Sequence, residues 1–125
     1  MDKLLYENEV FRIRGAIFEV YKEMGFGFLE PVYQECLAKE FLRANIPFGA
    51  QMPLTLAYKG EALVQTYRPD FICFDKIIVE LKACEGIASQ HKLQVLNYLR
   101  GTNLRLGLIV NFGASAKVQI ERVIF

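Results

Sequence analysis

Residues 67–83 read Tyr-Arg-Pro-Asp-Phe-Ile-Cys-Phe-Asp-Lys-Ile-Ile-Val-Glu-Leu-Lys-Ala, an apolar segment interrupted by charged side chains. The β-branched residues at 77–79 are typical of a buried strand. Within such a strand the carboxylate of Glu80 and the ammonium group of Lys82 are costly to desolvate unless they are paired or bind an ion. Residues two apart on a strand share a face, so we expect Glu80 and Lys82 on one face and their apolar neighbours on the other.

Asp70 lies on the preceding apolar run, and Asp75-Lys76 between the runs predicts the turn of a hairpin. Asp70 faces Glu80 only if Ile72 lies opposite Ile78, which requires a loop with an odd number of residues, or a bulge, around this turn. A two-residue turn would shift the pairing and place Asp70 on the wrong face. We therefore expect the odd-numbered loop.

The composition predicts one globular domain, which we expect to span residues 1–125. Hydrophobic residues make up 53% of the sequence and charged residues 23%, without low-complexity tracts, repeats or linkers. The net charge of +1 excludes the strongly basic field by which many proteins hold nucleic acid.

Cysteine usage and hydropathy predict a cytoplasmic protein. Cys36, Cys73 and Cys84 are odd in number and lack C-x-x-C spacing, so we expect small buried thiols. A zinc site would need a fourth ligand, and His91 is the only histidine. The sequence begins on a polar, charged segment, and no apolar run is long enough to span a membrane.

Two amphipathic helices are expected first in the chain. Apolar residues at three- and four-residue spacing predict a helix from Glu7 to Met24, ended by Gly25. Pro31 suits the first turn of a second helix running to about Ala44. The expected buried residues are Val10, Ile13, Ile17, Val20, Tyr21 and Met24 in the first helix and Val32, Cys36, Leu37 and Phe41 in the second.

Strand-forming residues follow. Residues 48–58 and 61–68 flank a turn that contains Gly60, which predicts a hairpin. Pro53 indicates an edge position for the first of these strands. We expect residues 70–74 and 77–83 to extend the same sheet.

Residues 87–100 have helical spacing and are expected to stop before Gly101. One expected stripe of this helix is for packing (Leu93, Leu96, Leu99), and a second mixes polar and aromatic groups (Ile87, Gln90 or His91, Gln94, Tyr98). Residues 104–110 and 117–125 predict two final strands. The resulting order α, α, β, β, β, α, β, β predicts an α/β (α+β) fold with a central mixed sheet flanked by helices.

Residues 27–33 form a G-x-x-E-x-x-Y segment. Together with Asp70, Glu80-Leu81-Lys82, the Gln94 to Tyr98 spacing and Leu-Ile-Val-Asn-Phe-Gly at 108–113, this segment resembles the GxxExxY family of small bacterial proteins, a branch of the PD-(D/E)xK nuclease superfamily. The resemblance covers roughly residues 8–125. It implies a restriction-endonuclease-like core.

The resemblance also implies a metal site. Asp70 and Glu80 would bind Mg²⁺ or Mn²⁺, with Leu81 supplying its carbonyl oxygen. Lys82 would orient or deprotonate the attacking water. Glu30 resembles the glutamate of the superfamily's first helix, which completes the acidic cluster directly or through a water.

Substrate contacts are implied for Gln94, Tyr98 and Tyr33. Gln94 and Tyr98 are one helical turn apart and resemble the Q-x-x-x-Y pair of exonuclease-like members. Local sequence leaves other interpretations open. Glu30 could stabilise a helix N-terminus by its charge, and Tyr33 could be a core aromatic. Gln94 could be a solvated helix residue, and His91 could lie at the rim of the site or on the surface.

Three functions compete. The first is a metal-dependent nuclease acting on DNA or RNA. The second is a non-cleaving module of the same fold that binds nucleic acid or a protein partner, which the modest charge favours slightly. The third is acid–base hydrolysis by two carboxylates, against which Lys82 argues because it should lower the pKa of Glu80. A homo-oligomer is left open, and no membrane association is expected.

Overall fold

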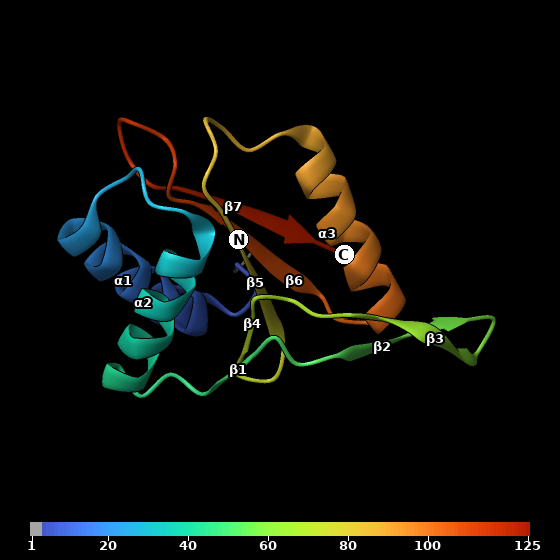
Figure 1. Cartoon of the computed structure of the whole chain (residues 1–125). Coiled ribbons are helices and arrows are strands. Elements are labelled where there is room, and N and C mark those ends of the chain that lie inside the picture. Colours follow the sequence, from blue (N-terminus) through green and yellow to red (C-terminus); the bar gives the residue numbers. More distant parts are fainter. Residues whose placement is uncertain (1–3) are drawn as a thin grey trace.

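The structure, a computed structural model, describes residues 4–125 and contains three helices and seven strands in this range (Figure 1). The central mixed sheet flanked by helices is confirmed, but five strands precede the third helix, whereas the predicted residue ranges gave four and the predicted order counted three. The helices are α1 (Glu7–Met24), α2 (Glu30–Arg43) and α3 (Ser89–Thr102), and the strands are β1 (Phe48–Ala50), β2 (Leu54–Tyr58), β3 (Glu61–Tyr67), β4 (Phe71–Cys73), β5 (Ile77–Lys82), β6 (Leu106–Asn111) and β7 (Gln119–Ile124).

Five strands form the central sheet in the order β1-β4-β5-β6-β7, with β5 and β6 parallel and the other pairs antiparallel. Helices α1 and α2 cover one face and α3 covers the other (Figure 1). On β5, Val79 and Leu81 pack toward α1 and α2, whereas Ile78 packs toward α3. Because side chains alternate along a strand, Glu80 and Lys82 share the α3 face with Ile78, as predicted.

The hairpin of β4 and β5 has the predicted register. Ile72 lies opposite Ile78, and residues 74–76 form a three-residue loop in which Phe74 and Asp75 have φ angles of 56° and 58°. Continuing this register by one residue places Asp70 opposite Glu80. The odd-numbered loop therefore brings the two acidic residues to the same point of the sheet.

Residues 48–58 form two strands, where the sequence predicted one. Gln51 has a φ of 57°, and Pro53 cannot donate to a ladder, so the chain leaves the central sheet after β1. The backbone N–H of Gln51 donates to the Asp70 carbonyl over 3.2 Å. Strand β1 remains at the sheet edge, and the break directs the following residues toward α3.

Strands β2 and β3 form a separate two-stranded sheet, residues 54–67, which we call the arm. The expectation that these strands belong to the main sheet is therefore wrong. The arm projects away from the body (Figure 1), and Leu54 and Leu56 attach its base to the cluster formed by α3. Most of β3 is exposed, but Tyr67 at its end is buried.

Helix α3 runs through Gly101 to Thr102, although the sequence predicted that it would stop before Gly101. A Cβ at Gly101 would lie 2.9 Å from Leu56 Cδ2, so this glycine makes room for the arm. Asn103, with a φ of 62°, follows the last helical residue. Leu93 was expected in the packing stripe but is 58% exposed, and Val95 is buried in its place.

The buried faces of α1 and α2 largely follow the predicted spacing, with Ile13, Ile17, Leu37 and Phe41 in the core. Of the three thiols expected to be buried, Cys73 is buried, whereas Cys36 and Cys84 are partly exposed.

Across residues 4–125, none of the helices has the length and apolar character needed to cross a membrane.

We predict that Gly113→Ala lowers the free energy of unfolding by about 3 kcal/mol. A Cβ at Gly113 would overlap the backbone nitrogen and oxygen of Cys84, which cannot move without disturbing the end of β5. Gly86→Ala is the matched control, since its Cβ would meet no atom within 4 Å. Urea unfolding measures both variants, and equal stabilities would show that this close approach is not required.

Candidate active site

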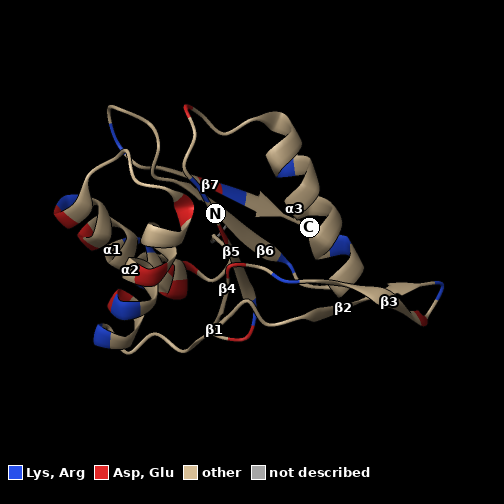
Figure 2. Ribbon diagram, viewed as in Figure 1, with Lys and Arg blue, Asp and Glu red and all other residues tan. Residues whose placement is uncertain are grey.

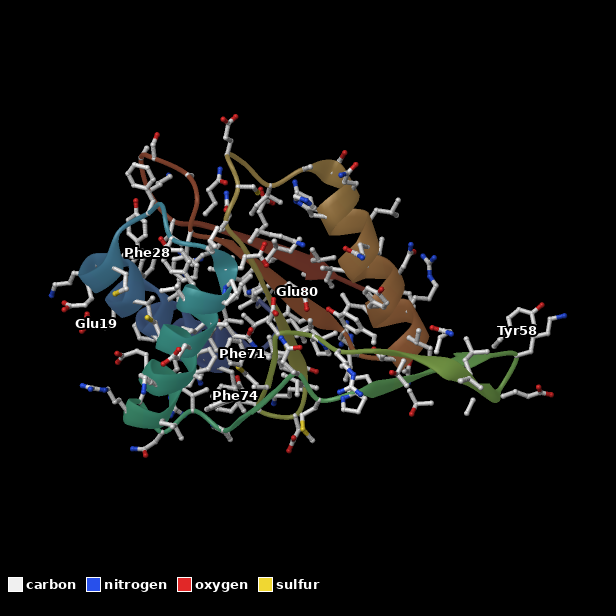
Figure 3. The ribbon with its side chains drawn as sticks, viewed as in Figure 1. Glu19, Phe28, Tyr58, Phe71, Phe74 and Glu80 are labelled. Atoms are coloured by element: carbon white, nitrogen blue, oxygen red, sulfur yellow. The ribbon has the colours of Figure 1, made fainter. Side chains whose placement is uncertain are left out.

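Glu80 lies on β5 at the centre of the molecule (Figure 3). Its Oε1 accepts two hydrogen bonds, one from the Tyr67 hydroxyl over 2.6 Å and one from the backbone N–H of Asp70 over 3.0 Å. Hydrogen bonds to a carboxylate are about twice as strong as neutral ones. They fix the side chain of Glu80 at the point where β4 separates from β5.

The side chain of Asp70 makes the reciprocal contact, because it accepts a hydrogen bond from the backbone of β5. Its Oδ2 accepts the backbone N–H of Leu81 over 2.8 Å, and its Oδ1 accepts a longer bond of 3.3 Å from Gln51 Nε2. Each carboxylate therefore binds an amide of the neighbouring strand. This reciprocal bonding replaces main-chain pairing beyond Phe71 and Val79, the last pair of the ladder.

Pro69 explains why the ladder stops there. The register places Pro69 opposite Leu81, and proline has no N–H to offer the Leu81 carbonyl. In a strand the N–H and C=O of one residue point to the same edge, so the Leu81 carbonyl faces the side on which its N–H meets Asp70. A backbone oxygen without a ladder donor therefore lies beside the two carboxylates.

A pocket of about 330 Å³ opens on the α3 face of the sheet. Of the mixed polar and aromatic stripe predicted for α3, His91, Gln94 and Tyr98 line the pocket, whereas Ile87 and Gln90 do not. The charged residues of β5 and this helix therefore line the same pocket. Its lining residues are Thr66, Tyr67, Arg68, Glu80, Lys82, His91, Gln94, Val95 and Tyr98.

Tyr67 is a site residue that the sequence reasoning missed. Its ring stacks on Tyr98, with centroids 3.6 Å apart and planes 3° from parallel, while its hydroxyl reaches Glu80. Tyr67 is 7% exposed, and a buried tyrosine needs a hydrogen-bond partner for its hydroxyl. That need for a partner is the signal that could have identified Tyr67 as a site residue. The partner could not be identified from sequence because the arm brings Tyr67 to the pocket.

Asn111 is a second residue without a predicted role. It is fully buried opposite Lys82, and both its side-chain oxygen and its side-chain nitrogen make two hydrogen bonds. Oδ1 accepts from the amides of Cys84 and Gly113, both over 3.0 Å, and Nδ2 donates to the Cys84 carbonyl and to Gln119 Oε1 over 2.9 and 2.8 Å. Asn111 therefore ties the segment after Lys82 to β6 and β7.

The structure does not bring Glu30 into the acidic pair. Glu30 is exposed in the first turn of α2, and no three His, Cys, Asp or Glu side chains within residues 4–125 are grouped so that they could hold a metal ion. Its position agrees with the alternative of a charge at a helix N-terminus.

Tyr33 lies in the core and not at the pocket. Its side chain is 0% exposed and its ring stacks on Phe112 with centroids 4.4 Å apart. The hydroxyl donates to the Gly25 carbonyl over 2.6 Å and accepts from the Phe28 amide over 3.3 Å. Tyr33 thus fixes the loop between α1 and α2, because a buried hydroxyl must be paired.

Burial controls the charge of the site. The pKa of Glu80 is raised to about 7 in total, mainly by burial and also by the charge of Asp70, although the bonds from Tyr67 and from the Asp70 amide and the charge of Lys82 lower it. Burial also raises the pKa of Asp70. Lys82 lowers the pKa of Glu80, as the sequence predicted, but desolvation outweighs the lysine and the net pKa is raised.

The model of the PD-(D/E)XK nuclease superfamily matches residues 7–123. The chain belongs to this superfamily. The match spans both carboxylates, Lys82 and all three helices, and the mixed sheet agrees with the predicted restriction-endonuclease-like fold. Membership in the PD-(D/E)XK superfamily supports a nuclease-type function in general terms. No curated protein and no solved structure matches the chain.

The donor set of this PD-(D/E)XK protein fits a hard divalent cation. Mg²⁺ is usually bound through one or two carboxylates together with waters and substrate phosphates, and it does not require an all-protein cage. Asp70, Glu80 and the Leu81 carbonyl supply oxygen donors of this kind. The residues present therefore suit Mg²⁺ or Mn²⁺ better than a metal that prefers nitrogen or sulfur.

We predict that Glu80 makes the metal-free protein less stable as the pH rises. The folded protein holds the proton on Glu80 until a pKa of about 7, whereas the ordinary pKa is 4.5, so ionisation favours the unfolded chain between these values. The free energy of unfolding should fall by up to about 3 kcal/mol across this window.

Glu80→Gln keeps an acceptor for Tyr67 but cannot ionise. Urea unfolding from pH 4 to pH 8 should therefore show a flatter profile for this variant than for the wild type. Profiles of equal slope would mean that Glu80 is not the destabilising acid.

Proposed function

We propose that this protein is a metal-dependent nuclease that hydrolyses phosphodiester bonds of DNA or RNA and belongs to the GxxExxY branch of its superfamily. The observation that carries the proposal is the reciprocal bonding of Asp70 and Glu80 next to Lys82. A purely structural ion pair would not need two acids, because two nearby carboxylates repel each other once both are ionised. A divalent cation relieves that repulsion.

Asp70, Glu80 and the Leu81 carbonyl would hold the cation. When bound, Mg²⁺ or Mn²⁺ supplies Lewis acidity at the phosphoryl oxygen and lowers the pKa of a coordinated water. Each carboxylate already has one oxygen bound to an amide of the neighbouring strand. Their orientation is therefore set before any ion arrives, and the site pays little reorganisation cost on binding.

Lys82 orients or deprotonates the attacking water and offsets negative charge at the phosphorus. It shares the β5 face with Glu80 and lines the same pocket. Its charge also lowers the pKa of both Asp70 and Glu80, so it favours the ionised carboxylates that bind metal. The buried amide of Asn111 holds the chain that follows Lys82.

Gln94 and Tyr98 contact the substrate from α3, with Arg68 and His91 at the same pocket. Within residues 4–125, Lys and Arg residues are spread over helices, strands and the arm (Figure 2). Affinity for the phosphate backbone therefore depends on the few charges of the pocket and on the metal. Glu30, in the exposed first turn of α2, and Tyr33, in the core, are not included in the proposed site.

We predict that Mg²⁺ raises the melting temperature of the wild-type protein and has no such effect on Asp70→Asn. The substitution keeps the shape of Asp70 while it removes one ligand charge, so the metal-free variant should be as stable as the wild type or more stable. Differential scanning calorimetry with and without Mg²⁺ measures both effects. A Mg²⁺ response that survives in Asp70→Asn would exclude Asp70 as a ligand.

Lys82→Ala should behave differently from Asp70→Asn. Because lysine is not a ligand, metal stabilisation should persist, while cleavage should fall at least about a hundredfold. The measurement is Mg²⁺- or Mn²⁺-dependent digestion of single- and double-stranded DNA and RNA. Lys39→Ala, an exposed lysine of α2, is the control and should cleave as the wild type does.

The non-cleaving alternative predicts another outcome of the same experiment. A binding module would show Mg²⁺ stabilisation or retention of polynucleotide without digestion of any of the four substrates. An acid–base hydrolase would show neither a metal response nor cleavage of nucleic acid.

A further inference from the structure

The two lone-pair directions of Glu80 Oε1 are both occupied. The Tyr67 hydroxyl takes one over 2.6 Å and the Asp70 amide takes the other over 3.0 Å. A carboxylate oxygen offers about two acceptor sites, so Oε1 is saturated by the protein itself. Oε2 accepts no hydrogen bond from any residue in the range 4–125.

A saturated oxygen limits how Glu80 can bind a cation. Bidentate coordination needs both oxygens, and here it would require Oε1 to give up the bond from Tyr67 or from Asp70. The Asp70 amide belongs to the backbone of the hairpin and cannot withdraw easily, so the hydroxyl of Tyr67 is the deciding group. Glu80 is thereby restricted to one oxygen, Oε2.

Divalent cations differ in how they respond to such a restriction. Mg²⁺ takes six ligands in an octahedron and usually binds each carboxylate through one oxygen, whereas Ca²⁺ takes six to eight oxygens and often binds carboxylates through two. We propose that Tyr67 is a positioning residue that makes the metal site selective for Mg²⁺ or Mn²⁺ over Ca²⁺ by occupying Glu80 Oε1. This inference rests on the proposed metal site.

The surroundings of Tyr67 make its hydroxyl a fixed group. The side chain is 7% exposed, and its ring lies flat on Tyr98 of α3, with centroids 3.6 Å apart. Withdrawal of the hydroxyl from Glu80 would therefore require the end of the arm and α3 to separate. Two elements that do not belong to the β4–β5 hairpin thus determine how many oxygens Glu80 offers.

The test compares cations in Tyr67→Phe. This variant keeps the aromatic ring, and hence the stack on Tyr98, but leaves one lone pair of Oε1 free. Calorimetric titration with MgCl₂ and with CaCl₂, without nucleic acid and at one pH, gives two dissociation constants for each protein. The ratio of the two dissociation constants cancels any change in the ionised fraction of Glu80. The control is Tyr58→Phe, at the exposed tip of the arm (Figure 3).

We expect the affinity for Ca²⁺ relative to Mg²⁺ to rise about tenfold in Tyr67→Phe, which corresponds to the loss of one charge-assisted hydrogen bond, and to stay unchanged in Tyr58→Phe. A purely structural role of Tyr67 would weaken both cations equally. An unchanged ratio in Tyr67→Phe, with Mg²⁺ still bound, would overturn the selectivity and leave the metal site intact.

The wild-type protein provides a measurement that does not depend on the variant folding. A site that offers one oxygen of Glu80 should bind Mg²⁺ and Mn²⁺ more tightly than the larger Ca²⁺ and Sr²⁺. Tighter binding of Ca²⁺ would overturn the inference, and the absence of binding by all four cations would overturn the proposed function with it.

Discussion

The site depends on the hydrogen bonds at the end of the β4–β5 hairpin. There two carboxylates accept from main-chain amides in place of the carbonyl partners of a ladder. Pro69 removes a donor from that ladder, and the amides of Asp70 and Leu81 then bind the side chains of Glu80 and Asp70 across the gap. Buried amides must be paired, so the carboxylates are needed to end the hairpin without loss of stability. The hydrogen bonds that end the hairpin therefore also position the two acids of the site.

The cost of this arrangement appears in the charge of Glu80. Its carboxylate is largely desolvated, and mainly for that reason its pKa rises to about 7. Tyr67 and Lys82 lower that pKa without cancelling the effect of burial. A carboxylate in this state gains free energy from any nearby cation, which is the physical basis of the proposed metal binding in a protein whose net charge is only +1.

Much of the hairpin could be predicted because its determinants are local. Alternation fixes the faces of β5, and the pairing of Ile72 with Ile78 follows from the requirement that Asp70 face Glu80. The hairpin that forms the arm was predicted, but its separation from the central sheet could not be, since the break at Gln51 and the role of Gly101 depend on contacts between distant segments. Tyr67 was missed for the same reason. The positions of Glu30 and Tyr33 show that a motif spacing alone does not decide whether a side chain faces the site or the core.

The most direct test of the central claim is anomalous diffraction from crystals grown with Mn²⁺. The account predicts one strong anomalous peak bound by the carboxylates of Asp70 and Glu80 and the carbonyl of Leu81, at about 2.0–2.2 Å as expected for small hard cations. The hydroxyl of Tyr67 should still be bonded to Glu80 Oε1 in that crystal. A crystal without a peak at this position, or with Mn²⁺ bound only at other carboxylates, would contradict the account.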